Sequence, residues 1–259
     1  MVFFKTSAGV LADSAVRQAL VKAANVNQII NGLGYPVIPV REPLLNNQLG
    51  YNPVYNQQSD NPAAAEAQLQ QDGWVTGAGG YRYKNGQQLG FGLYAADTSQ
   101  SRFVVGQLVR QWKAIGVNVQ PVYEDDTTLQ NTVALHNYDA LLYGISIGVD
   151  PDVFVYWDSS QASPQSGAWL NFSEYRSAAA DQSLEAGRTV INPALRVIKY
   201  QGFLQAWQND APALGLYQPR FLYITHETVH GLSDHPINTE AGRFDNVVNW
   251  EINTGPVAN

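Results

Sequence analysis

Residues 13–30, DSAVRQALVKAANVNQII, decide the class of fold that the rest of the chain completes. Asp13 or Ser14 predicts a helix start, because their side-chain oxygens accept hydrogen bonds from free backbone N–H groups. Val16 and Leu20 follow at helical spacing, so the helix has one apolar face. The stretch therefore predicts an amphipathic helix near the start of the sequence.

Helical and extended patterns alternate along the rest of the chain. We expect helices at residues 62–72, 101–115, 127–136, 174–187 and 193–209. We expect strands at residues 2–4, 117–123, 138–147, 213–217, 221–225 and 247–250, and an irregular, proline-rich connection at 35–58. Asn85-Gly86 favours positive φ at both central positions of a tight turn, which predicts a hairpin at 81–89. This mixture of elements predicts an α/β fold.

Composition excludes several classes of partner and chemistry. The net charge is −7 and no run of Lys or Arg occurs, so nucleic acid is not an expected partner. The absence of Cys excludes disulfides, thiolate metal sites and Cys nucleophiles. No stretch approaches the roughly 20 apolar residues that span a bilayer. Charged residues make up only 14% of the chain, which fits an exported bacterial protein.

The segment His226-Glu-Thr-Val-His230 matches HExxH, the metal-binding signature of zinc proteases. That chemistry requires a helix, which brings residues i and i+4 onto one face. The neighbouring residues favour a strand, in which i and i+4 lie roughly 13 Å apart at about 3.3 Å per residue. One metal ion cannot bridge that distance, so we expect no metal site there. A zinc-dependent hydrolase that uses His226, Glu227 and His230 is kept as an alternative.

Two acidic groups are the other candidates for catalysis or metal binding, Glu124-Asp125-Asp126 and Asp150-Pro-Asp152. Neither has the ligand spacing of a calcium-binding EF-hand. The first is expected to cap the helix that begins near Thr127. No GxSxG motif, P-loop or dinucleotide-binding fingerprint occurs, so we expect neither catalytic residues nor a cofactor.

A stretch of small and apolar residues, Gly144-Ile-Ser-Ile-Gly148, lies at the end of an expected strand. Small residues leave backbone N–H and C=O groups accessible to a ligand. The aromatic residues around the stretch, Tyr143, Tyr156 and Trp157, offer walls that grip a ligand without requiring one particular side chain. These features predict a binding cleft at this strand end.

Six further pieces of sequence accompany residues 13–30 in a definite order. They are Tyr51-Asn-Pro with Pro62–Trp74, Gln107–Val119, Tyr138–Leu142 with Gly144, Asp150-Pro-Asp152, Ala211–Tyr217 and Val229-His-Gly231. Their order and composition resemble those of the family 5 extracellular solute-binding proteins, which include dipeptide, oligopeptide and nickel receptors. The resemblance covers nearly the whole chain.

The resemblance implies a periplasmic-binding-protein type II-like lobe, with a mixed sheet flanked by helices, and a receptor that delivers its ligand to an ABC transporter permease. Residues 1–217 would form the second, C-terminal lobe, and the first, N-terminal lobe is expected to lie outside this sequence. Residues 218–259 would return to pack on that first lobe. An export signal or membrane anchor would belong to the absent part, which implies an extracellular or periplasmic location. A sensing or interaction module of the same fold, without transport, is the remaining alternative.

The resemblance also places the ligand at residues 143–150. In peptide-binding members an acidic residue there holds the peptide's ammonium group, whereas the matching Ile147 and Gly148 are not acidic and Asp150 is the nearest substitute. Ile145 also replaces the family's usual Trp. A peptide is therefore an expectation from the family, and another small solute stays open. The candidate ligand-binding residues are Tyr143, Gly144, Ile145, Ser146, Ile147, Asp150, Tyr156 and Trp157.

Overall fold

A five-stranded mixed sheet lies at the centre of the molecule, seen here in a computed structural model. The structure describes residues 1–148, 150–163, 169–220, 222, 224, 229–232 and 240–252. The strands of the sheet, in spatial order, are β7 (Asn118–Glu124), β6 (Gly90–Ala96), β8 (Ala140–Leu142), β1 (Val2–Phe4) and β9 (Ala213–Leu214). Strand β6 runs parallel to β7 and β8, whereas β1 is antiparallel to β8 and β9. The predicted α/β fold with a mixed sheet is confirmed.

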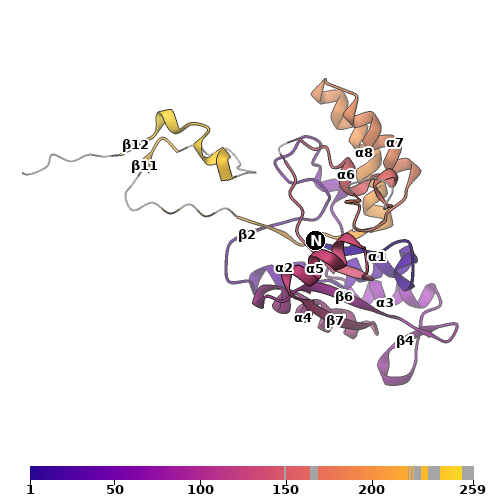
Figure 1. Ribbon diagram of the computed structural model, residues 1–259. Coiled ribbons are helices and arrows are strands. Elements are labelled where there is room, and N and C mark those ends of the chain that lie inside the picture. The colour runs from indigo at the N-terminus through magenta and orange to yellow at the C-terminus, as the bar shows by residue number, and fades with distance from the viewer. Residues whose placement is uncertain are drawn as a thin grey trace, which may run out of the picture.

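Helices cover both faces of this sheet (Figure 1). The first core joins the sheet to α1 (Ser14–Ala23), α2 (Val26–Asn31), α3 (Pro62–Gln71) and α4 (Ser99–Ala114). The second core joins it to α5 (Asp126–Ala134), α6 (Phe154–Trp157), α7 (Ala178–Arg188) and α8 (Pro193–Asp210). Successive strand residues point to opposite faces, so Val2 and Phe4 belong to the first core and Phe3 to the second.

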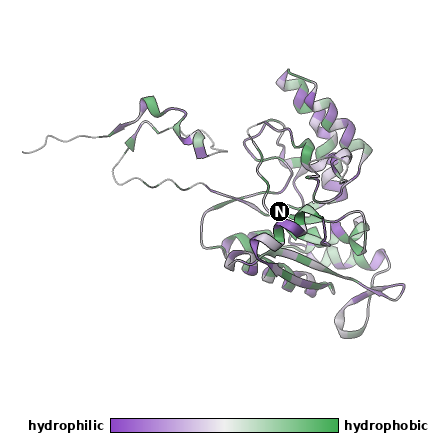
Figure 2. Cartoon of the chain, in the orientation of Figure 1, coloured by the Kyte–Doolittle hydropathy of each residue, from purple (hydrophilic) through white to green (hydrophobic). Residues whose placement is uncertain are grey.

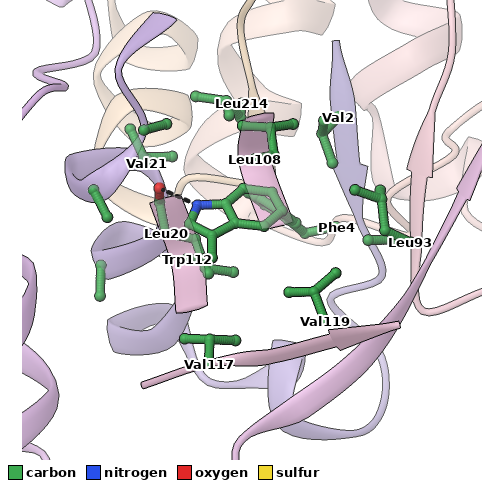
Figure 3. Packing of buried hydrophobic residues seen from close by; sticks show 14 of the residues in the cluster. Val2, Phe4, Leu20, Val21, Leu93, Leu108, Trp112, Val117, Val119 and Leu214 are labelled. Atoms are coloured by element: carbon green, nitrogen blue, oxygen red, sulfur yellow. Dashed lines mark hydrogen bonds between the residues drawn. The ribbon is translucent and has the colours of Figure 1, made fainter. Parts of the chain in front are cut away.

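Trp112 of α4 is a fully buried tryptophan of the first core. Its indole lies among apolar side chains from the helices and the sheet, including Phe4 and Leu108 (Figure 3). The indole Nε1 donates a hydrogen bond to the Leu20 carbonyl oxygen of α1 at 2.9 Å. This bond satisfies the one polar atom of a side chain that burial would otherwise penalise.

Side-chain caps begin all of the predicted helices except α7. The Asp13 carboxylate accepts a hydrogen bond from the Ala15 N–H at 2.9 Å, and Asp125 accepts one from the Thr128 N–H at 3.0 Å. Both bonds satisfy backbone donors that have no partner within the first turn. The predicted helices at 13–30, 62–72, 101–115, 127–136, 174–187 and 193–209 are therefore confirmed, with small shifts at their ends and a break between α1 and α2.

The predicted hairpin at 81–89 is also confirmed. Strands β4 (Arg82–Lys84) and β5 (Gln87–Gln88) pair antiparallel, and β3 (Val75–Thr76) adds to β4. Asn85 has φ 55° and Gly86 has φ 80°. These are the two positive values that a tight two-residue turn requires.

Three predicted strands differ from the structure, and a fourth lies mostly outside the described residues. The strand expected at 213–217 is divided into β9 (Ala213–Leu214) and β10 (Tyr217–Pro219), which belong to different sheets. The strand expected at 138–147 ends at Leu142, because β1 offers pairing partners only for Ala140–Leu142. Residues 247–250 contain a 3-10 helix, Val247–Asn249, instead of a strand. Of the strand expected at 221–225, only residues 222 and 224 are described, and neither is in a strand. Short 3-10 helices also occur at Val10–Ala12, Pro53–Tyr55, Ala78–Gly80, Ser159–Gln161 and Glu240–Phe244.

Two small antiparallel pairs lie outside the main sheet. Strand β2 (Val37–Pro39), in the connection that was expected to be irregular, pairs with β10 (Tyr217–Pro219). Strand β11 (Val229–His230) pairs with β12 (Glu251–Ile252). Figure 2 shows apolar and polar residues intermixed around β11 and β12, where Val248 and Ile252 are exposed. Within the described part of the chain, no helix has both the length and the apolar composition needed to cross a membrane.

Candidate functional site

The chain leaves the sheet at Tyr143 and continues as residues 143–148 without regular structure. The Tyr143 N–H donates a hydrogen bond to the Met1 carbonyl oxygen at 3.0 Å. From Gly144 to Gly148, the backbone N–H groups form no hydrogen bond with another described residue. Residues 143–148, which we call the strand-end segment, therefore present main-chain groups that a ligand can use.

Side chains alternate in exposure along the strand-end segment. Tyr143, Ile145 and Ile147 are partly buried against the second core. Gly144 and Gly148 face open space, because a Cβ added at either position would meet no atom within 4 Å. The exposed side of the segment is thus made of small residues and main chain, as the sequence predicts.

Two adjoining hollows lie beside the strand-end segment. The smaller hollow has a volume of about 200 Å³ and the larger about 360 Å³. Both are lined by Met1, Gly144, Tyr217 and Pro219, so the segment and strand β10 form their shared wall. The smaller hollow is completed by Val40, Leu45, Ile145, Ser146, Ile147 and Gln218.

The larger hollow has a polar rim. Gln130 of α5 donates a hydrogen bond from Nε2 to the Tyr143 hydroxyl at 3.2 Å. Gln100 of α4 donates from Nε2 to the Tyr217 hydroxyl at 2.7 Å. Asp126, in the first turn of α5, contributes the only carboxylate among the described residues of either lining. Side chains from both faces of the sheet therefore meet at this strand end.

Side chains from distant parts of the sequence hold the strand-end segment in place. Tyr156 of α6 donates a hydrogen bond to the Ser146 carbonyl oxygen at 3.0 Å. Gln48, which is buried in the connection that follows β2, donates from Nε2 to the Gly148 carbonyl oxygen at 2.6 Å. The predicted residue Tyr156 thus supports the site through the main chain and does not itself line either hollow.

Asp150, predicted as a ligand carboxylate, is paired with a cation of the protein. Its two oxygens accept hydrogen bonds from the two terminal nitrogens of Arg196, at 2.7 and 2.6 Å. These bonds from Arg196 lower the pKa of the Asp150 carboxyl. Arg196 is oriented in turn by the Gly187 carbonyl oxygen, 3.0 Å from its Nε. Asp150 does not line either hollow and has its charge already matched.

Trp157, another predicted contact, is fully buried in the second core. Its ring stacks on Phe3 at a centroid distance of 5.7 Å and packs edge-on against Trp207 at 5.7 Å. In this position the side chain supports the sheet and does not line the hollows. The cluster of aromatic residues in the sequence did not distinguish such a core position from a binding position.

Only part of the candidate zinc motif lies within the described residues. His226 and Glu227 lie outside the described residues, and His230 belongs to strand β11. Among the described residues, no group of three or more His, Cys, Asp or Glu side chains is placed to hold a metal ion. His230 therefore occupies a strand, as the neighbouring sequence predicts.

A buried carboxyl group lies in the connection that supports the site. Glu42 is 0% exposed, and its Oε1 accepts a hydrogen bond from the Asn52 N–H at 3.3 Å, while its Oε2 has no hydrogen-bond partner among the described residues. Burial raises the pKa of this carboxyl from its usual 4.5 to about 8. Glu42, Gln48 and Leu45 carry no recognisable sequence signal, because only long-range contacts bring their segment to the strand end.

Comparison with known proteins shows which family and which relatives the sequence matches. The model for the middle region of bacterial extracellular solute-binding proteins, family 5, matches residues 1–166. Protein XP55 from Streptomyces lividans is 28% identical over 240 residues, which cover 85% of this chain and 39% of that protein.

Solved structures share the fold over almost the whole chain. NikZ from Campylobacter jejuni, in complex with Ni(L-His), has a TM-score of 0.80 at 23% identity and covers 96% of this chain. The oligopeptide-binding protein AppA from Bacillus subtilis, in complex with a nonapeptide, has a TM-score of 0.78 at 22% identity and covers 97%. The match takes up 50% of each of those two chains. The chain spans half the length of these proteins, and the expected type II periplasmic-binding-protein fold is confirmed.

Proposed function

This chain belongs to the bacterial extracellular solute-binding proteins of family 5, and on that premise we propose that it captures a peptide or similar small solute outside the cell for an ABC transporter permease. The observation that carries the proposal is the strand-end segment, residues 143–148. Its main chain is accessible, its exposed residues are small, and it forms a wall of both hollows. Concave surfaces with a few convergent polar groups are the usual form of small-molecule sites.

The chemistry of the two hollows supports binding and not catalysis. Main-chain N–H and C=O groups recognise peptides and other amide-containing solutes without a dedicated side chain. The described linings contain no His or Lys, and among the described residues no hydrogen bond joins their one carboxylate, Asp126, to a serine or tyrosine hydroxyl of the linings. A general acid–base or nucleophilic mechanism needs such a pair within hydrogen-bond reach. The matched family model and the AppA structure are likewise named for binding.

We further infer that residues 1–217 form one lobe of a two-lobed receptor. The chain covers half of the solved binding proteins that share its fold, which supports a partner lobe of similar size. Residues 218–259 would pack on that first lobe. Apolar side chains in this segment support the inference, because Ile224 and Val248 are each 89% exposed.

Native mass spectrometry of the protein, purified from its host without added ligand, tests the proposal. We expect a bound small molecule that is lost from Gly144→Phe, because the new ring has open space to enter and fills the shared wall of the hollows. Gly106→Phe is the matched control, since its added Cβ also meets nothing within 4 Å but lies on α4. A small molecule kept by both variants would reject the strand-end segment as the site. Its absence from all three proteins would contradict the capture of a solute.

A further inference from the structure

The smaller hollow has an apolar lining. Six of its ten described lining residues are apolar, and none of the ten carries a charged side chain. The apolar residues are Met1, Val40, Leu45, Ile145, Ile147 and Pro219. The polar groups that remain are the Ser146 and Gln218 side chains, the Tyr217 hydroxyl, the main chain and the Met1 amino group. The Met1 amino group donates to the Tyr143 carbonyl oxygen at 3.0 Å, and burial lowers its pKa to about 5, so it is neutral at pH 7. At about 200 Å³ the hollow is smaller than a typical site for a whole drug-sized ligand, so it suits one part of a larger molecule.

Charged and polar groups near the smaller hollow are already engaged by the protein. The Asp150 carboxylate is bonded twice by Arg196. The Gln48 amide donates to the Gly148 carbonyl oxygen and accepts from the Leu45 N–H at 2.8 Å. A ligand ammonium or carboxylate placed here would lose water without gaining an opposite charge, which costs free energy.

We propose that the ligand places an uncharged apolar group in the smaller hollow, and that Ile147 sets this preference. The inference deepens the proposed function, on which it rests, by giving the chemical class of the bound group. Ile147 is the informative residue, because it lines the hollow and is also packed against the second core. A carboxylate at this position would supply the missing countercharge for a cation.

Three small probes with one carbon skeleton test the inference on the full 259-residue chain at pH 7: 3-methylbutan-1-ol, 3-methylbutylamine and 3-methylbutanoate. They differ only in being neutral, cationic or anionic. Binding is followed by the shifts of the backbone amide resonances of residues 144–147 in two-dimensional NMR spectra. We expect millimolar binding of the alcohol, and binding of the amine and the carboxylate that is weaker by roughly five- to tenfold.

Substitutions then move the preference. Ile147→Asp should make the amine bind more tightly than the alcohol, whereas its uncharged match, Ile147→Asn, should weaken the alcohol without favouring the amine. Ser146→Asp adds a carboxylate to the lining itself at an exposed position, where little packing is lost. It should also favour the amine, and it keeps the test decisive if Ile147→Asp fails to fold.

Three results overturn the inference. They are an amine that binds the unmodified chain as tightly as the alcohol, an alcohol that leaves the resonances of 144–147 unmoved, and folded aspartate variants that do not favour the amine. None of these results changes what the mass spectrometry of co-purified ligand reports. Failure of this inference is therefore distinguishable from failure of the proposed function.

Discussion

Replacing Glu42 with Gln should stabilise the protein, and by an amount that grows with pH. Glu42 is fully buried and burial raises the pKa of its carboxyl from 4.5 to about 8. The pKa of the Glu42 carboxyl is higher in the folded state than in the unfolded state. The stability that the protonated carboxyl contributes is therefore fully present below pH 4.5. It is lost as pH rises toward 8, because the unfolded chain ionises first. Gln keeps the acceptor for the Asn52 N–H and cannot ionise.

The pKa shift of Glu42 sets the size of this stability difference. A difference of about 3.5 between the two pKa values corresponds to roughly 5 kcal/mol at 1.36 kcal/mol per pKa unit. The segment around Glu42 can relax and admit water when the group ionises, which lowers this ceiling. We therefore expect the free energy of unfolding of Glu42→Gln to exceed that of the unmodified chain by about 1–3 kcal/mol at pH 8.5. Near pH 4.5 the two proteins should differ far less.

Urea unfolding, followed by tryptophan fluorescence at half-unit intervals from pH 4.5 to 8.5, measures this difference. Glu66→Gln, on the exposed face of α3, reports the effect of removing a surface carboxyl group. The decisive quantity is the gap between the unmodified chain and Glu42→Gln as a function of pH. A gap that stays constant across this range would refute the assignment of a buried, protonated Glu42.

Two further stability predictions follow from the contacts around the site. Trp157→Ala should lower the free energy of unfolding by about 3–5 kcal/mol in urea, since it removes a fully buried ring that packs on Phe3 and Trp207; a loss below about 1 kcal/mol would show that this ring is not part of the core. Asp150→Asn should cost at most about 1 kcal/mol at pH 7, because the Asp150 side chain is 59% exposed. Arg196 lowers the pKa of Asp150, so this contribution is present above the ordinary carboxyl pKa and disappears as pH falls through the lowered value. An Asp150→Asn cost that does not decrease as pH is lowered below the ordinary carboxyl pKa would contradict the ion pair as its cause.

Local signals in the sequence predicted most of the helices and strands. Asp13 and Asp125 cap α1 and α5, and Asn85-Gly86 makes the tight turn, because each of these effects operates within a few residues. The end of β8 was not predictable in this way. The pattern of residues 138–147 suits a strand throughout, but pairing with β1 stops at Leu142. Strand length here depends on a neighbour more than 100 positions away in the sequence.

The same distinction explains which residues of the candidate site could be predicted from the sequence. Gly144, Ile145, Ser146 and Ile147 were predicted from their small size and their place at a strand end, and they line the smaller hollow. Val40, Leu45 and Tyr217 were missed, because nothing local marks them. Pairing of β2 with β10 brings Val40 and Tyr217 to the site from positions far apart in the chain.

Asp150 shows why the lining, and not the nearest acidic residue, indicates the chemistry of the ligand. Sequence proximity made Asp150 the natural candidate for holding a cation. The structure pairs it with Arg196, which lies 46 positions later and is itself fixed by the Gly187 carbonyl oxygen. Gln48 and Tyr156 hold the carbonyl oxygens of Gly148 and Ser146 in the same way. These long-range bonds engage the polar groups beside the strand-end segment. The smaller hollow therefore keeps a mainly apolar lining, and we expect its ligand preference to follow from the residues of that lining.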